Sequence, residues 1–307
     1  MNDFSHESVM VDEIVDVFST VPTGVVLDGT LGGGGHAEAL LASRRDLSIL
    51  GLDRDPSALD AARTRLADVA DRVIVQHRRF DDIDDALAEA GIATLSGALF
   101  DLGVSSHQFD VASRGFSYRH DAPLDMRMDP TESRTAAEIV NEWTVEELAR
   151  LLRTNADERF AHRIAEAIVA ARPVTTTQQL AEIVVAAIPA PARRRGGHPA
   201  KRTFQALRIE VNRELEVLPV ALDRVVNRLR SGGRVAVLSY HSGEDRIVKA
   251  RFRHHETGGC TCPSGLPCGC GAQAAVRRVR VPARPSEAER TRNPRSASAR
   301  LRVVEAV

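Results

Sequence analysis

A run of four glycines between an apolar segment and a helical segment limits the possible folds of this chain more than any other feature. The apolar residues Val25–Leu27 end in Asp28, the glycines Gly32–Gly35 follow, and the next residues have a helical pattern. A second apolar segment ends at Asp53, about 20 residues after the glycines. A strand, a glycine-rich turn, a helix and a strand ending in an acid form a cofactor-binding unit in α/β sheets. The pattern predicts a cofactor that contains a ribose, with its hydroxyls bound by Asp53.

The glycine run leaves the identity of this cofactor open. Gly32, Gly34 and Ala37 fit the relaxed dinucleotide fingerprint. Asp28 in front of the glycines, and the lack of a complete G-x-G-x-x-G pattern, suit S-adenosylmethionine equally well. A third interpretation is a tight turn that needs glycine for packing alone, although one or two glycines would be enough for that.

Further apolar segments alternate with helical ones up to about residue 101 and predict a parallel, doubly wound sheet. Ligands bind at the carboxyl ends of the strands in such sheets. The expected strands are Val25–Asp28, Ile49–Asp53, Val73–Gln76 and Ala98–Asp101. The residues at or just past their carboxyl ends are Asp28, Asp53, Phe80 and Asp101.

The pattern changes after Gln108. Residues 109–128 are irregular, and residues 135–188 have only helical patterns, with capping boxes that start at Thr144 and Thr176. We therefore divide the chain into a first part of an α/β domain at 1–108, an inserted helical domain at 109–202, and a second part of the α/β domain at 203–307.

The last third of the chain is predicted to return to the sheet. An amphipathic helix is expected at 203–218, and Pro219 is expected to open another helix that ends at Gly232–Gly233. The closing segments are a strand at Arg234–Ser239, an antiparallel pair at 276–281 and 300–304, and a loosely ordered basic arm at 282–298.

The net charge of −1 hides an uneven distribution of charge. Acidic residues concentrate at 53–60 and 81–89, and arginines at 193–202 and 277–302. Basic patches on a nearly neutral protein fit a surface that touches nucleic acid, although ordinary solvated surface also explains each patch alone. No apolar segment reaches the ~20 residues of a membrane span, and the N-terminus lacks a signal-peptide pattern. We expect a cytoplasmic protein without a membrane partner.

Two strand ends carry candidate catalytic groups. Asp101, followed by Gly103 and Ser105, would place a carboxylate and backbone carbonyls over the cofactor, but a helix cap and turn explain the same residues. His241, after the returning strand, would accept a proton or bind a base, or would simply be satisfied at a strand end. The aromatic residues available to stack on a base are Phe109, Phe116, Tyr118 and Tyr240.

A basic loop joins the inserted helical domain to the amphipathic helix. Lys201, Arg202 and Arg208 lie at this junction and are candidates for phosphate contacts with RNA. The apolar stripe of the same helix is expected to be core. Together with Tyr240, these three cations are the predicted RNA-binding residues.

The four cysteines lie close together in one segment rich in glycine and proline. They are Cys260, Cys262, Cys268 and Cys270, so they do not form a dispersed disulfide framework. Four thiolates would hold a structural zinc ion in tetrahedral geometry. Their C-x-C spacing is tighter than the usual zinc spacing, and four reduced thiols are the alternative.

Taken together, these motifs resemble those of the bacterial 16S rRNA cytosine-N4 methyltransferases, and the resemblance runs over nearly the whole chain. The matching segments are Asp28–Thr30, Gly34–His36, Asp53–Pro56, Asp101–Ser106, Gly115–Ser117, Pro123–Met128, Arg202–Arg208, Ser239–Ser242, Glu244–Arg246 and the cysteine segment. Exocyclic-amine methyltransferases usually have two prolines and an aromatic residue after the acid. Here the prolines are absent and Val104 stands in place of the aromatic residue.

The resemblance implies a class I S-adenosylmethionine-dependent methyltransferase with a Rossmann-like doubly wound sheet and a helical insert that recognises rRNA. The implied substrate is the N4 amine of a decoding-centre cytidine in 16S rRNA of the small ribosomal subunit. The implied cofactor contacts are Gly34, Gly35, His36, Asp53, Phe80, Asp101 and Gln108. Gln108 comes from the resemblance alone.

Two other functions remain as alternatives. An NAD-dependent oxidoreductase would use the same fold, but we find no second nucleotide-binding half with a catalytic acid or base. A non-catalytic RNA-binding assembly factor would use the basic segments and leave the glycine loop without a ligand. A dimer is also an open alternative to a monomer.

Overall fold

The computed structural model describes residues 8–105, 108–109, 111–193, 197–263 and 269–307. The chain divides into two compact units. The first unit consists of Met1–Gly103 and Leu215–Val307, and the second consists of Val104–Glu214. Each unit is described below by itself.

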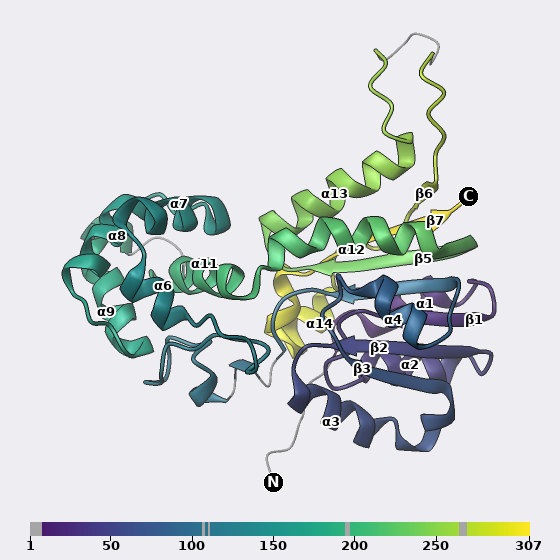
Figure 1. The fold of residues 1–307 in the computed structure, drawn as a ribbon, viewed down its shortest axis with the longest axis horizontal. Helices are drawn as coiled ribbons and strands as arrows, with labels where there is room; N and C mark the ends of the chain where they lie inside the picture. Colours follow the sequence, from purple (N-terminus) through teal and green to yellow (C-terminus); the bar gives the residue numbers. More distant parts are fainter. Residues whose placement is uncertain (1–7, 106–107, 110, 194–196, 264–268) are drawn as a thin grey trace. The chain divides into compact units, whose positions relative to one another are not determined.

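A mixed sheet, seven-stranded within the described residues, forms the centre of the first unit (Figure 1). Its order is β3-β2-β1-β4-β5-β7-β6, with β1 to β5 parallel and β7 antiparallel to both of its neighbours. The predicted doubly wound sheet is therefore confirmed. The strands are β1 (Gly24–Asp28), β2 (Leu47–Asp53), β3 (Val73–His77), β4 (Leu95–Asp101), β5 (Leu229–Ser239), β6 (Val276–Val279) and β7 (Arg300–Ala306).

Helices cover both faces of this sheet because alternate strand residues point to opposite sides. Leu27, Phe100 and Val237 pack on one face with α4 (Ile83–Glu89), α12 (Glu214–Arg228) and α13 (Ser242–Thr257). The residues next to them in sequence pack on the other face with α1 (Val11–Phe18), α2 (Gly35–Ser43) and α3 (Pro56–Arg65). A 3-10 helix, η1, spans Ala67–Arg72. No helix in the described part of the chain is long and apolar enough to cross a bilayer.

The order of the strands changes direction between β1 and β4. Successive strands add on one side of β1 up to β3, and β4 then pairs with the other side of β1. In an open parallel sheet, the crevice at such a switch point is where ligands bind. The carboxyl ends of β1, β2, β4 and β5 meet there, so the topology brings Asp28, Asp53 and Asp101 to one edge.

The boundary between the helix predicted at 203–218 and the helix that follows it lies six residues before Pro219. Helix α11 (Lys201–Asn212) ends where Arg213 adopts a left-handed backbone, with φ at 52°, and α12 starts at Glu214. Pro219 lies inside α12. The glycines expected to cap this helix belong to β5 instead, where Gly232 has φ at 78° at an irregular register with β4. Both predicted boundaries were wrong, because the left-handed Arg213 ends α11 before Pro219 is reached, and α12 gives way to β5 at Leu229 before the glycines.

The segment predicted to be a loosely ordered basic arm is folded. It contains α14 (Glu287–Arg292), which is capped by Ser286, and η3 (Pro294–Ser298). Glu289 is 8% exposed and accepts a hydrogen bond of 2.8 Å from the backbone N–H of Met10. The arm prediction was wrong because this one acidic residue ties the arginine-rich segment to the beginning of the chain.

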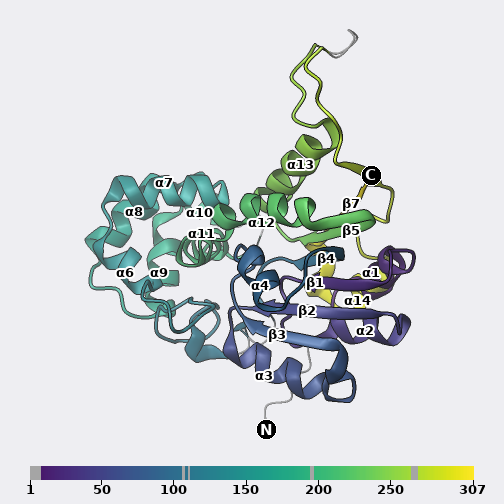
Figure 2. The same ribbon diagram turned by 45° about the vertical axis from the view of Figure 1, so that its right-hand side comes forward.

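The second unit is a helical body with one hydrophobic core (Figure 2). The capping boxes predicted at Thr144 and Thr176 are confirmed, and Thr135 with Glu138 forms a third one. The unit extends to Glu214, beyond the predicted end of the insert at 202, because α11 contributes Phe204, Leu207 and Val211 to this core. Its other elements are η2 (Ala112–Arg114), α6 (Ala136–Glu142), α7 (Val145–Ala156), α8 (Ala161–Ala170), α9 (Thr177–Ala187) and α10 (Ala190–Arg193).

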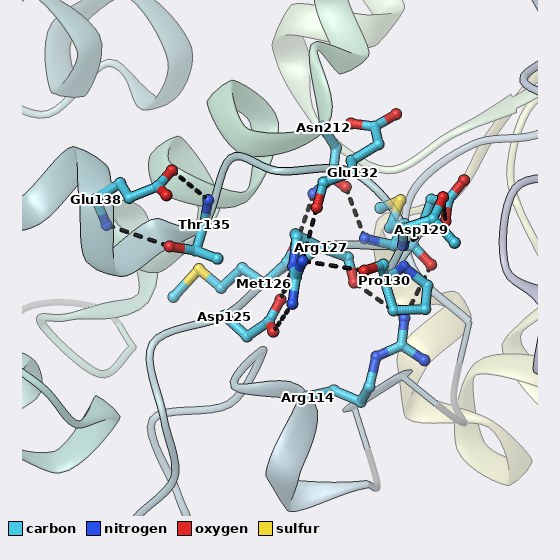
Figure 3. Close-up of polar contacts among 12 residues, drawn as sticks. Arg114, Asp125, Met126, Arg127, Asp129, Pro130, Glu132, Thr135, Glu138 and Asn212 are labelled. Carbon is cyan, nitrogen blue, oxygen red and sulfur yellow. Dashed lines mark hydrogen bonds and ion pairs between the residues drawn. The ribbon is translucent and has the colours of Figure 1, made fainter.

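Buried polar contacts hold the irregular segment that precedes α6 (Figure 3). Met126 is fully buried and has φ at 62°, a conformation that is uncommon for a residue with a side chain. Asn212 holds this turn from α11, since its Nδ2 donates to the carbonyl of Met126 and its Oδ1 accepts from the N–H of Met128, both at 2.8 Å. Arg127 binds the Asp125 carboxylate through two nitrogens, at 2.8 and 2.7 Å. These contacts replace the regular backbone pairing that the segment lacks.

Candidate active site at the carboxyl edge of the sheet

The glycine loop connects β1 to α2 and approaches its neighbours too closely for larger residues. Gly34 has φ at 80° and caps the N-terminus of α2. A Cβ on Gly34 would lie 3.2 Å from the Leu66 side chain, and a Cβ on Gly35 would overlap the hydroxyl oxygen of Ser8. The loop therefore favours glycine at both positions because of its packing against Leu66 and Ser8, and the approach of a ligand to this backbone stays a prediction.

Asp53 is bound to this loop. Its Oδ2 accepts a hydrogen bond of 2.8 Å from the N–H of Gly32, and its Oδ1 accepts one of 2.9 Å from the N–H of Asp55. Burial raises the pKa of the Asp53 carboxyl, although these two N–H groups act in the opposite direction. A carboxylate oxygen has more than one lone pair, so Asp53 still has capacity to accept hydrogen bonds from a ribose.

Asp28, at the end of β1, is almost completely buried, at 1% exposure. Its Oδ1 accepts a hydrogen bond of 3.2 Å from the N–H of Thr30. Burial raises the pKa of the Asp28 carboxyl to about 7, and the charges of Asp101 and Asp53 act in the same direction. His36 acts in the opposite direction by attraction. Three carboxyl groups thus share one edge and influence one another.

Asp101 is held by side chains from three other segments. The Tyr240 hydroxyl donates to its Oδ1 at 2.6 Å, and the Thr30 hydroxyl oxygen accepts from its backbone N–H at 2.6 Å. The Nδ1 atom of His36 lies 3.8 Å from its Oδ2. Burial and the neighbouring Asp101 carboxylate raise the pKa of Tyr240 well above its usual value, so this phenol stays neutral and acts as a donor.

His36 connects this edge to the beginning of the chain. Its Nε2 lies 2.8 Å from the carbonyl oxygen of Val9, so Nε2 must carry a proton there. The next residue, Met10, is held by Glu289 of α14. The segment that includes Ser8, Val9 and Met10 therefore lies against the glycine loop. Neither this segment nor Thr30 was predicted to be part of the site, and only the position of Thr30, two residues after a strand-end acid, distinguishes it in the sequence.

Phe80 lies next to the beginning of the glycine loop. It packs edge-on against Phe100, with ring centroids 5.8 Å apart. A Cβ on Gly29 would lie 2.6 Å from the Phe100 ring and 3.4 Å from Cβ of Phe80. The phenylalanine predicted from its position past β3 is therefore brought to the same edge as Asp28.

His241 has a structural role in the described geometry. Its Nδ1 accepts a hydrogen bond of 3.2 Å from the N–H of Gly243, and Glu244 binds back to the backbone of His241, which completes a capping box at the start of α13. Its Nε2 lies 3.2 Å from Oε1 of Glu244 and is buried without a hydrogen-bond partner among the described residues. This geometry uses Nδ1 in the helix cap and leaves Nε2 without a hydrogen bond to the described part of the chain, so it matches the alternative of a histidine satisfied at a strand end only in part.

The other predicted site residues lie in the second unit. The Oε1 atom of Gln108, a residue that is 4% exposed, accepts a hydrogen bond of 3.1 Å from the N–H of Ser105. Lys201 and Arg202 are exposed at the start of α11, and Arg202 donates to the carbonyl of Asp157 at 3.1 Å. Arg208 binds both carboxylate oxygens of Glu214, at 2.8 and 2.9 Å, so it contributes to the unit itself.

The four aromatic candidates differ in their surroundings. Phe116 is buried in the core of the second unit, and Tyr118 stacks on His198 at 4.3 Å between ring centroids. The hydroxyl of Tyr240 is bound to Asp101. Phe109 is 37% exposed. Of the four, Phe109 is thus the residue with the largest exposed fraction.

Three of the four cysteines are described, and their sulfur atoms are close together. The Sγ atoms of Cys260, Cys262 and Cys270 lie within 4.8 Å of one another. Cys268 lies outside the described residues. The cluster belongs to the segment between α13 and β6, at the far end of α13 from His241.

The charge at the carboxyl edge selects between kinds of ligand. Asp53 and Asp101 favour a cationic ligand and oppose an anionic one when they are ionised, and Asp28 adds to this effect only at a pH above its raised pKa of about 7. The N–H of Gly32, which a pyrophosphate would need, already donates to Asp53. The edge therefore fits a sulfonium ion and a ribose better than the pyrophosphate of a dinucleotide.

Comparison with known proteins shows the family of this chain. Residues 3–307 match the model of the MraW methylase family. A protein of Symbiobacterium thermophilum called Ribosomal RNA small subunit methyltransferase H is 52% identical, with 98% of this chain and 96% of the relative covered. A protein of the same name from Thermobifida fusca is 51% identical, with 98% and 93% covered. A solved structure of a putative rRNA-methylase from Clostridium thermocellum aligns at 12% identity and a TM-score of 0.45, with 98% of this chain and 99% of that chain covered.

Proposed function

Because the chain belongs to the MraW methylase family, we propose that it transfers the methyl group of S-adenosylmethionine to the N4 amine of a decoding-centre cytidine in 16S rRNA. Its fold is that of a class I, Rossmann-like methyltransferase. The substrate would be rRNA of the small ribosomal subunit in the cytoplasm. The observation that carries the proposal is the edge at which Asp53, Asp101 and the glycine loop meet.

The residues at this edge fit S-adenosylmethionine. Gly34 and Gly35 keep the loop free of side chains, and Asp53 has the remaining acceptor capacity for the ribose hydroxyls. Phe80 provides an apolar wall, and the acids favour the positive charge of the sulfonium. S-adenosylmethionine supplies a methyl group that is already reactive, so the main task of the protein is to position the two reactants.

Asp101 is the group best placed to assist the amine. The lone pair of a cytosine amine is conjugated with the ring, so an acceptor for its N–H favours the nucleophilic, pyramidal form. Asp101 retains lone pairs beyond the bond from Tyr240, and Thr30 and Tyr240 fix its orientation. His241 is the weaker candidate because its Nδ1 is occupied by the N–H of Gly243.

The direct test is methyl transfer to small ribosomal subunits that were isolated from cells lacking the protein. We expect nucleoside mass spectrometry to find N4-methylated cytidine after incubation with the protein and S-adenosylmethionine. Asp101→Asn keeps the shape of the side chain but weakens it as an acceptor, so the rate should fall while cofactor binding persists. Absence of methylated cytidine with folded protein that binds S-adenosylmethionine would contradict the proposal and favour an assembly factor. Tighter binding of NAD than of S-adenosylmethionine would favour the oxidoreductase.

Asp53→Ala is expected to weaken binding of S-adenosylmethionine about 10- to 150-fold, because hydrogen bonds to a charged group contribute about 1.5–3 kcal/mol. Calorimetric titration of the purified variant measures this change. Asp71→Asn, at an exposed position of the same unit, is the control and should bind like the parent. An unchanged affinity in folded Asp53→Ala protein would show that this carboxylate does not hold the ribose.

Replacing Lys201 and Arg202 together by alanine is expected to weaken binding of rRNA and to flatten its salt dependence. Each lost phosphate contact should reduce the slope of log K against log salt concentration by about 0.7–0.9. Filter binding at several salt concentrations measures this slope. Arg45→Gln, before β2 at the amino end of the sheet, is the matched control. A double variant with the slope of the parent would remove these two side chains from the RNA-binding surface.

A further inference from the structure

The segment between α13 and β6 forms an arm that projects from the sheet of the first unit (Figure 1). We call residues 258–275 the cysteine arm; its described residues are 258–263 and 269–275. Helix α13 starts after β5 at the carboxyl edge and has 16 residues, so it carries the chain about 24 Å away from that edge. The cysteine arm is therefore remote from the candidate active site.

The base of the cysteine arm is fixed by backbone contacts. Gly258 has φ at 60°, and a Cβ on it would overlap the backbone of Gln273. The N–H of Ala275 donates to the carbonyl of His255 at 2.9 Å. The N–H of Cys260 donates to the carbonyl of Thr257 at 3.1 Å. Beyond these contacts, no described residue of the arm is buried. Apolar packing therefore does not explain how the described parts of the arm keep one conformation.

The described cysteines converge in this unpacked arm. The Sγ atoms of Cys260 and Cys270 are 3.6 Å apart, and Cys262 lies within 4.8 Å of both. A disulfide requires about 2.05 Å between sulfur atoms. Thiolates that share a tetrahedral zinc ion, each with a bond of about 2.3 Å, are about 3.8 Å apart. The observed spacing excludes a disulfide, and it fits either a hydrogen bond between two thiols or a shared metal ion.

We propose that Cys260, Cys262 and Cys270 bind a structural zinc ion that joins the two described parts of the cysteine arm. Zinc prefers thiolate ligands, and each thiol gives up its proton when the metal binds, so binding releases protons. The ion takes the place of apolar packing, since no residue at 258–263 or 269–275 is buried. Cys268, predicted as a fourth ligand, lies outside the described residues, and the proposed site consists of the other three cysteines. Methyl transfer is not involved, so this site can fail without affecting the proposed function.

The test begins with elemental analysis of protein purified without added metal. We expect about one zinc ion per chain. A variant with Cys260, Cys262 and Cys270 all changed to serine should contain less than about a tenth of that amount, because serine is a poor ligand for zinc. Thr261→Ala, which changes an exposed residue between two of the cysteines, is the matched control and should keep its zinc.

Replacement of the metal by cobalt gives a readout that does not depend on activity. Cobalt bound to the wild-type protein should show the intense thiolate charge-transfer band and the visible bands of a tetrahedral site, with release of protons into weakly buffered solution. Chelation should make the arm sensitive to protease while the melting temperature of the rest changes little. Wild-type protein that contains no zinc, shows no cobalt–thiolate band after reconstitution and has three reactive thiols at these positions would overturn the proposal.

Discussion

Replacing Asn212 by alanine is expected to lower the free energy of unfolding by about 2–6 kcal/mol. The substitution removes the partners of the Met126 carbonyl and the Met128 N–H, and both residues are buried. Each unsatisfied buried backbone group costs about 1–3 kcal/mol. The turn is especially sensitive because Met126 has a left-handed backbone that surrounding contacts must stabilise.

Denaturant unfolding of the variant and the parent measures this loss. Asn155→Ala is the matched control, because Asn155 is a half-buried residue of the same unit whose hydrogen bonds, at 3.4 and 3.3 Å, are long. It should cost less than about 1 kcal/mol. If Asn212→Ala were no more costly than Asn155→Ala, the turn at Met126 would have to be held by other contacts.

Asp28→Asn is expected to stabilise the protein at alkaline pH by up to about 4 kcal/mol. The pKa of Asp28 is raised from 3.8 to about 7 in the folded protein, because burial penalises the charged carboxylate. The folded state thus holds a proton that the unfolded state releases, and the stability from this group falls as pH rises from about 4 to about 7. Asparagine stays neutral and avoids this loss.

The prediction is tested by the difference in stability between Asp28→Asn and the parent at pH 4 and pH 8. The difference should be small at pH 4, where Asp28 is largely neutral when folded, and large at pH 8. Asp71→Asn, at an exposed position, should show little change with pH in the same comparison. A difference for Asp28→Asn that stays constant between pH 4 and pH 8 would show that Asp28 is not a buried acid with a raised pKa.

Local patterns along the chain were sufficient for the sheet and for the centre of the site. The strands β1 to β4 alternate with helices, and the glycine run with Asp28, Asp53 and Asp101 lies at their carboxyl ends, where the topology confirms a common edge. The capping boxes at Thr144 and Thr176 could also be predicted from the sequence. Such features depend on residues only a few positions apart, whose spacing determines their geometry directly.

Contacts between distant residues were decided only by the tertiary structure. Val9 meets His36, Tyr240 meets Asp101, and Glu289 holds Met10 across 279 positions of the chain. The arginine-rich composition around Glu289 indicated a solvated arm, yet that one carboxylate is buried as a partner for a backbone N–H. No local pattern predicts such a partner, because a buried polar group is stabilised by whatever the fold brings next to it.

Charge and ionisation at the site also depended on the assembled structure. Three acids separated by tens of residues were visible in the sequence, but the pKa of about 7 at Asp28 arises from its burial and from two other carboxylates at the same edge. Similarly, His241 was a candidate for catalysis, but in the structure its Nδ1 accepts a hydrogen bond in a helix cap. Arg208 was a candidate for phosphate binding, but in the structure it binds Glu214. The sequence by itself determined which chemical groups were available and which strand ends carried them. The tertiary structure decided which groups keep free lone pairs or charge, because burial and hydrogen-bond partners are set by packing between distant segments.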